Sequence, residues 1–165
     1  MIDRAVIRCA TAEDWPNIAP IFHEIVNAGE TYAFDPDMSD AAARNLWLEH
    51  PPGQTVVAVV DEQVAGTAKM GPNRPARGAH VATASFMVSP TYQARGIGRA
   101  LAAYAIEWAQ TSGYRSMQFN AVVETNVAAV ALWRSLGFEV IGTAPEAFDH
   151  PQHGLVGLHV MFRRL

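Results

Sequence analysis

Hydrophobic positions along the chain follow two different spacings, which predict a protein built from both strands and helices. Short apolar or alternating runs predict strands over 5–9, 55–60, 63–70, 80–88, 117–123, 138–142 and 155–162. Apolar residues three or four apart predict helices over 11–27, 39–49 and 127–135, and a longer helix from a glycine-rich turn at 93–99 to Ser112. The resulting order, β-α-α-β-β-β-α-β-α-β-β, predicts one mixed α/β sheet with helices on both faces.

Local signals mark the ends of these helices. Thr11 and Asp14 match a capping box at the start of the first helix, and Pro20 inside that helix is expected to kink or delay it. Thr125 and Asn126 can cap the last helix, which Gly137 ends.

Composition limits the class of protein. The chain has 165 residues, a formal net charge of −4 and one cysteine, so we expect a single domain over 1–165 without disulfide bonds. It has no run of basic residues and no apolar stretch of about 18 residues. We therefore expect a cytoplasmic protein that binds neither nucleic acid nor membrane.

A glycine-rich segment follows the apolar strand end Phe86–Val88. It reads Gln-Ala-Arg-Gly-Ile-Gly-Arg over 93–99 and leads directly into the long helix. Closely spaced glycines let successive backbone N–H groups converge, and a helix N-terminus attracts negative charge. The segment matches neither a Walker A loop nor a dinucleotide-binding fingerprint, because Arg99 and Leu101 stand where those patterns need lysine and glycine. It predicts a site for a phosphate or pyrophosphate.

A second motif lies one strand later, in the segment 126–138. Its spacing is Asn-x-x-Ala-x-x-Leu-Trp-x-x-x-Gly-Phe. Together with Gln-x-x-Gly-x-Gly at 93–98, it resembles the two signatures of the GCN5-related N-acetyltransferases, the GNAT superfamily. The resemblance is clear from about Thr55 to Gly142 and rests on pattern alone in the first helices.

This resemblance implies a sheet of about seven strands, splayed between the fourth and fifth, that binds acetyl-CoA as co-substrate and needs no metal. The pantetheine arm would pair with Phe86–Val88 like an added strand, and a local bulge there would direct an N–H at the thioester oxygen. The implied cofactor contacts are Phe86, Met87, Val88, Gln93, Ala94, Arg95, Gly96, Ile97, Gly98, Arg99, Asn126, Ala129 and Trp133. Trp133 replaces the commoner tyrosine and has no acidic proton for the leaving thiolate.

The acceptor is expected to be the amine of a small molecule. Strand residues 84–89 and 119–129 resemble the L-azetidine-2-carboxylate and proline-analogue acetyltransferases, which implies catalytic positions at Ser85, Met87 and Asn120. The phosphinothricin-type enzymes carry a glutamate where this chain has Thr83, which argues against that branch. Residues 27–37 would roof the acceptor site, with substrate contacts from Glu30, Tyr32, Phe34 and Asn120.

Several alternatives stay open at this point. A protein N-terminal or lysine acetyltransferase and a noncatalytic acyl-CoA sensor share the same motifs, and a homodimer is an expectation by analogy. The general base is undecided among Glu30, Tyr32, His80 and Glu124. The pair His150 and His153 lacks a nearby carboxylate, so we expect no metal there.

Overall fold

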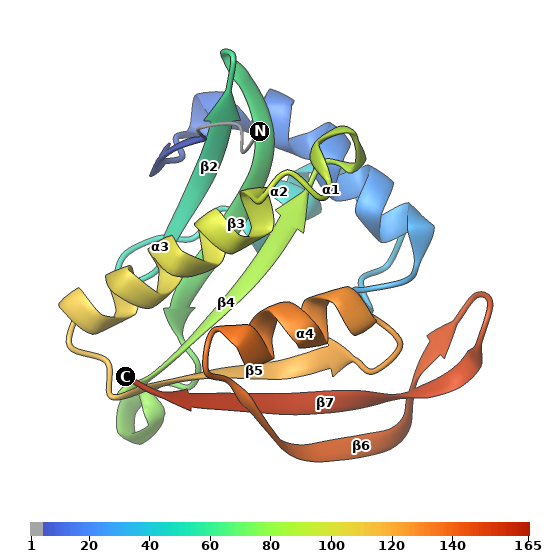
Figure 1. Ribbon diagram of the computed structural model, residues 1–165. Coiled ribbons are helices and arrows are strands. Elements are labelled where there is room, and N and C mark those ends of the chain that lie inside the picture. Colours follow the sequence, from blue (N-terminus) through green and yellow to red (C-terminus); the bar gives the residue numbers. More distant parts are fainter. Residues whose placement is uncertain (1–4) are drawn as a thin grey trace.

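The computed structural model describes residues 5–165, and its centre is a seven-stranded mixed sheet (Figure 1). The strands are β1 (Val6–Cys9), β2 (Gln54–Val60), β3 (Gln63–Pro72), β4 (Val81–Val88), β5 (Ser116–Val123), β6 (Glu139–His150) and β7 (Gly154–Arg164). Their spatial order is β1-β2-β3-β4-β5-β7-β6, in which only β4 and β5 run parallel. The predicted fold class and element order are confirmed.

Helices cover both faces of the sheet, as Figure 1 shows. The helices are α1 (Trp15–Ala28), α2 (Asp40–Trp47), α3 (Ile97–Thr111) and α4 (Val127–Ser135). Neighbouring strand residues face opposite ways, so Val56 packs in the core with α3 and α4 whereas Val57 packs in the core with α1 and α2. The two helical layers are thereby fixed by alternation within one strand.

Two predicted elements differ from the structure. Helix α1 begins at Trp15 rather than at Thr11, after a 3-10 turn over Ala12–Asp14, and it continues through Pro20, which has no N–H to donate to the carbonyl of Pro16. Strand β6 continues from Glu139 to His150 rather than stopping at Gly142. Its register with β7 shifts twice, and the second shift, between Ala144 and Phe148, contains Pro145 and Glu146, whose φ is positive.

The sheet opens between its fourth and fifth strands. β4 and β5 are paired only at Val81 with Ser116 and at Ala82 with Met117, whereas β4 pairs with β3 along its whole length. The two strands then diverge toward their carboxyl ends, and α4 lies over the opening (Figure 1). The predicted splay is confirmed, and it exposes one edge of β4 in the middle of the sheet.

An ion pair at the start of α1 predicts an acid-sensitive contribution to stability. Both oxygens of the Asp14 carboxylate accept from Arg8, at 2.9 and 2.7 Å, and one also accepts from the Thr11 N–H at 2.7 Å, which confirms the capping box. Arg8 and Thr11 lower the pKa of Asp14 to about 2, against about 3.9 in an unfolded chain.

The charged form of Asp14 therefore stabilises the fold above pH 4, and this contribution is lost as the pH falls toward 2. We expect Asp14→Asn to cost about 2 kcal/mol at pH 7 and much less at pH 2.5. Urea unfolding of both proteins across this range measures the difference. An equal loss at both pH values would show that Asp14 acts through packing rather than charge.

Candidate active site

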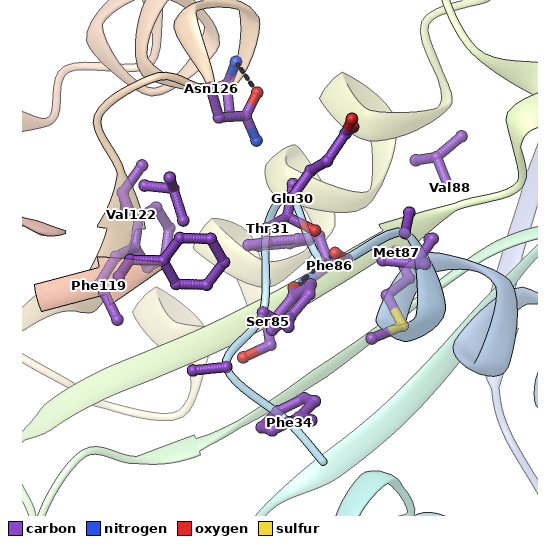
Figure 2. Close-up of a pocket in the computed structure, with 18 of the residues that line it drawn as sticks. Glu30, Thr31, Phe34, Ser85, Phe86, Met87, Val88, Phe119, Val122 and Asn126 are labelled. Atoms are coloured by element: carbon purple, nitrogen blue, oxygen red, sulfur yellow. Dashed lines mark hydrogen bonds between the residues drawn. The ribbon is translucent and has the colours of Figure 1, made fainter. Parts of the chain in front are cut away.

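A cavity of about 610 Å³ lies where β4 and β5 diverge. It is enclosed by the α1–α2 loop, the second half of β4, the end of β5 and the start of α4. Figure 2 shows Phe119 and Val122 of β5 on one side, with Ser85, Phe86 and Met87 of β4 on the other. The opening of the sheet therefore forms a pocket rather than a groove filled by side chains.

Most of the predicted site residues meet in this cavity. Its lining includes Glu30, Tyr32, Phe34, Ser85, Phe86, Met87, Val88, Gln93, Asn120, Asn126, Ala129 and Trp133. Residues 94–99 lie outside the lining, in the turn before α3 and in the first three residues of that helix. The cavity thus contains the predicted acceptor and thioester positions, and the predicted pyrophosphate site is a neighbouring surface.

The turn before α3 has the geometry of an anion site. Ala94 and Gly96 have positive φ angles of 59° and 83°, a conformation that turns backbone N–H groups toward one side. Gly96 precedes α3 as its N-cap and has no side chain that could accept from the first amides of the helix. Arg95 lies over the Tyr92 ring, and Arg99 donates to the Ser135 hydroxyl at 2.9 Å. Positive charge and the first backbone amides of a helix therefore coincide at this helix start.

The main chain of β4 turns one edge toward the cavity. Phe86 donates its N–H to the Tyr32 hydroxyl at 2.9 Å, and that hydroxyl donates to the Phe86 carbonyl at 2.6 Å. The backbone N–H and C=O groups of residues two apart on a strand point to the same edge. Those of Val88 therefore point to the same edge as those of Phe86, whereas those of Met87 point toward β3. The pairing of β3 with β4 has no register shift, so the bulge predicted at Phe86–Val88 is absent from it. A regular strand already presents the Phe86 N–H to the cavity.

Tyr32 is held in place by aromatic packing as well as by hydrogen bonds. Its ring stacks on Phe34, with centroids 5.2 Å apart, and meets Trp47 edge-on at 6.3 Å. Burial raises the pKa of Tyr32 to about 12, while hydrogen bonds with Phe86 and Ser85 act in the opposite direction. The phenol therefore keeps its proton at neutral pH and serves as a hydrogen-bond donor.

Helix α4 contributes a polar cap and an aromatic wall. The Asn126 side chain accepts from the Ala129 N–H at 3.3 Å, as Figure 2 shows, so its amide group is left at the cavity. Trp133 is buried, and its ring lies 4.9 Å from Phe86 and 4.8 Å from Phe119. The indole thus packs into the core and forms part of the cavity wall.

Comparison with known proteins decides the family. Residues 19–138 match the model of the Acetyltransferase (GNAT) family, which covers more than half of the chain. The protein belongs to the GNAT family. A solved GCN5-related N-acetyltransferase from Kribbella flavida is 58% identical, with a TM-score of 0.95 over 98% of each chain.

More distant GNAT relatives include enzymes named for small substrates. An L-methionine sulfoximine/L-methionine sulfone acetyltransferase of Pseudomonas aeruginosa is 30% identical over 86% of this chain and 84% of its own. A phosphinothricin acetyltransferase from Sinorhizobium meliloti, solved in complex with AcCoA, is 27% identical with a TM-score of 0.87, covering 100% of this chain and 89% of that one. Two further curated relatives are longer, and this chain spans 66% of one and 15% of the other.

Asn120 is held at the edge of the GNAT cavity by a chain of amides. Its side-chain nitrogen donates to Asn73 at 2.6 Å, and its side-chain oxygen accepts from Gln118 at 2.9 Å. Asn73 belongs to the loop between β3 and β4, which the sequence motifs did not point to. These contacts set the direction of the Asn120 amide beside the cavity.

The structure separates the candidate bases. Glu30 and Tyr32 line the cavity, and so does Glu24 of α1, which sequence reasoning missed. Glu124 instead accepts the Gly157 N–H at 2.6 Å, outside the lining. His80 precedes β4 at its paired end, where its carbonyl accepts from Arg115. The carboxylates that can reach the cavity therefore come from the α1 side.

The His150 side chain holds the turn of the β6–β7 hairpin. His150 is buried, and its Nδ1 accepts backbone N–H groups of Gln152 and His153 at 3.1 and 3.3 Å. Within residues 5–165, no three or more His, Cys, Asp and Glu side chains are grouped for a metal ion.

Across the same range, no helix is long and apolar enough to cross a membrane.

Proposed function

We propose that this GNAT domain transfers an acetyl group from acetyl-CoA directly to the amine of a small molecule, with an amino acid or proline analogue as the leading acceptor. The observation that carries the proposal is the Phe86 N–H, which points from the unpaired edge of β4 into the cavity, where it donates to the Tyr32 hydroxyl. Family membership and the AcCoA complex of the phosphinothricin acetyltransferase support the donor.

The residues present fit acetyl-CoA from one end to the other. The amides and arginines at the start of α3 suit the pyrophosphate. The open edge of β4 at Phe86 and Val88 suits the amide groups of pantetheine, which would pair as an added strand. Asn126 and the small Ala129 border the same path on α4. The thioester would then lie against the main chain of Phe86.

The proposed chemistry is a direct attack of the neutral amine on the thioester carbon. The Phe86 N–H would stabilise negative charge on the carbonyl oxygen, a donor worth about 3 kcal/mol in comparable sites. Glu30 or Glu24 would take the amine proton, directly or through water. Because the Trp133 indole cannot supply a proton, the thiolate of CoA would be protonated from solvent.

The shape of the cavity favours a small acceptor over a peptide. Tyr32 and Phe34 close the roof, and Tyr32 is tied to β4 by two hydrogen bonds. Ser85 and Asn120 place polar groups in the lining for an amine and a carboxylate. The relative named for methionine sulfoximine and methionine sulfone supports an amino-acid acceptor, whereas Thr83 stands where the phosphinothricin branch has its glutamate.

Release of CoA, followed with a thiol reagent, tests this proposal across amino acids, proline analogues, polyamines and short peptides. We expect turnover on an amino acid or analogue. We expect Asn120→Ala to lower kcat/KM for that acceptor roughly 10-fold to 100-fold, the usual cost of losing a hydrogen bond to a charged group. Asn45→Ala, on the exposed face of α2, is the matched control. Turnover only on peptides would favour the protein acetyltransferase, and acetyl-CoA binding without any turnover would favour the sensor.

A further inference from the structure

The Tyr32 hydroxyl occupies a position with a specific meaning for acyl transfer. Its oxygen is 2.9 Å from the Phe86 nitrogen, the distance at which that N–H holds an acceptor. Any acceptor bound by the same N–H would therefore lie where this oxygen lies. Under the function proposed above, that acceptor is the thioester oxygen, so binding of acetyl-CoA must take the Phe86 N–H from Tyr32.

When the thioester oxygen takes the Phe86 N–H from the Tyr32 hydroxyl, the phenolic proton of Tyr32 would lie beside the thioester. The Tyr32 ring stacks on Phe34 and meets Trp47 edge-on, and these contacts would keep the ring beside the cavity when its hydroxyl gives up the Phe86 N–H. The hydroxyl now donates to the Phe86 carbonyl, and rotation about its C–O bond redirects this proton to a neighbouring oxygen. The Phe86 N–H and the Tyr32 O–H would then point at one oxygen atom.

We propose that Tyr32 is a catalytic residue whose hydroxyl is the second hydrogen-bond donor to the thioester oxygen, beside the Phe86 N–H. This inference rests on the proposed function. As the amine nitrogen bonds to the carbonyl carbon, the C=O π electrons move to the oxygen, where both donors stabilise the charge. The electron pair then returns, the C–S bond breaks with its pair on the CoA sulfur, and the amine proton leaves through the base.

Tyr32 keeps its proton throughout this step. Burial raises the pKa of Tyr32 to about 12, above the value of about 8.5 for a free thiol, so proton transfer from Tyr32 to the leaving thiolate is uphill. Hydrogen bonding to the oxyanion needs no such transfer. Tyr32 therefore does not replace the acid that Trp133 lacks, but strengthens the oxyanion site instead.

Infrared difference spectra with acetyl-CoA labelled with ¹³C at the thioester carbonyl test the contact without any acceptor. A hydrogen bond weakens the C=O bond, so we expect the bound carbonyl band at a higher wavenumber in Tyr32→Phe than in the unmodified protein. Tyr104→Phe is the matched control, since its hydroxyl contacts Gln54 outside the cavity. The same band position in all three proteins would overturn the inference while leaving the proposed function intact.

Kinetics on the acceptor found above separate catalysis from structure. Tyr32→Phe keeps the ring and its stacking, and we expect kcat to fall about 10-fold to 100-fold, with an acetyl-CoA Kd no weaker than in the unmodified protein. A raised KM for acetyl-CoA with unchanged kcat would assign Tyr32 to the roof alone and reject the oxyanion role. Failure of every variant and of the unmodified protein to bind acetyl-CoA would overturn the proposed function as well.

Discussion

Replacement of Trp47 by alanine is expected to destabilise the fold by about 3–5 kcal/mol, the usual cost of removing a large aromatic side chain from a core. Trp47 is fully buried at the end of α2, where its ring contacts Phe22 edge-on. Its Nε1 donates to the Thr67 hydroxyl at 3.0 Å, and this hydroxyl in turn donates to Val56. The variant would leave both a cavity and a buried hydroxyl without its donor.

Urea unfolding followed by circular dichroism measures this loss. For a chain of this length, 3–5 kcal/mol corresponds to a fall in Tm of about 6–20 °C. Trp108→Ala is the matched control, because Trp108 is only partly buried on α3 and stacks on Tyr114. A similar loss of unfolding free energy in the two variants would mean that packing between the sheet and the layer of α1 and α2 adds no special stability at Trp47. Trp47→Phe should recover most of the packing but not the hydrogen bond.

Reversal of both arginines at the start of α3 is expected to weaken acetyl-CoA binding about 30-fold to 100-fold. In Arg95→Glu/Arg99→Glu, two cations beside the proposed pyrophosphate site become anions at a helix N-terminus. Each substitution replaces the attraction between an arginine and the pyrophosphate by a repulsion of similar size, and costs on the order of 1 kcal/mol of binding free energy at a solvated site. The helix dipole, which attracts the pyrophosphate, compensates little of this loss.

Titration calorimetry with acetyl-CoA at low and at high salt measures this effect. The loss should shrink at high salt, because solvated charges are screened. Arg77→Glu reverses a charge on the loop between β3 and β4, away from α3, and should change the affinity by no more than about twofold. An unchanged Kd in the double variant would place the pyrophosphate elsewhere than 93–99.

Segments whose ends carry capping or stop residues were predicted closely. Helix α4 begins and ends where Asn126 and Gly137 indicated, since an amide cap and a left-handed glycine are local signals. The end of strand β6 was not predicted. Most of this strand is exposed, so its sequence lacks an alternation of apolar and polar residues, and its pairing with β7 keeps it extended. Local sequence carries caps and turns but not the hydrogen bonds supplied by a distant strand.

The candidate site shows the same division. The residues on β4, β5 and α4 could be located because their motifs are short and continuous. The contact of Tyr32 with Phe86 joins positions 54 residues apart, and no periodicity predicts which hydroxyl reaches which carbonyl. Glu24 lies one helical turn before the roof loop and lines the cavity because of how α1 docks, and its own neighbours in sequence give no sign of it.

Strand edges normally lie at the rim of a sheet, where proteins shield them from other strands. Here β4 has an edge at the centre of the fold, sealed at Phe86 by a side chain rather than by a neighbouring strand. A strand-like donor would complete the sheet, so ligand binding and the last step of β-sheet formation would be one event. Hydrogen exchange at the Phe86 and Val88 amides should then slow in proportion to acetyl-CoA occupancy, while exchange at Met87, already within the ladder, changes least.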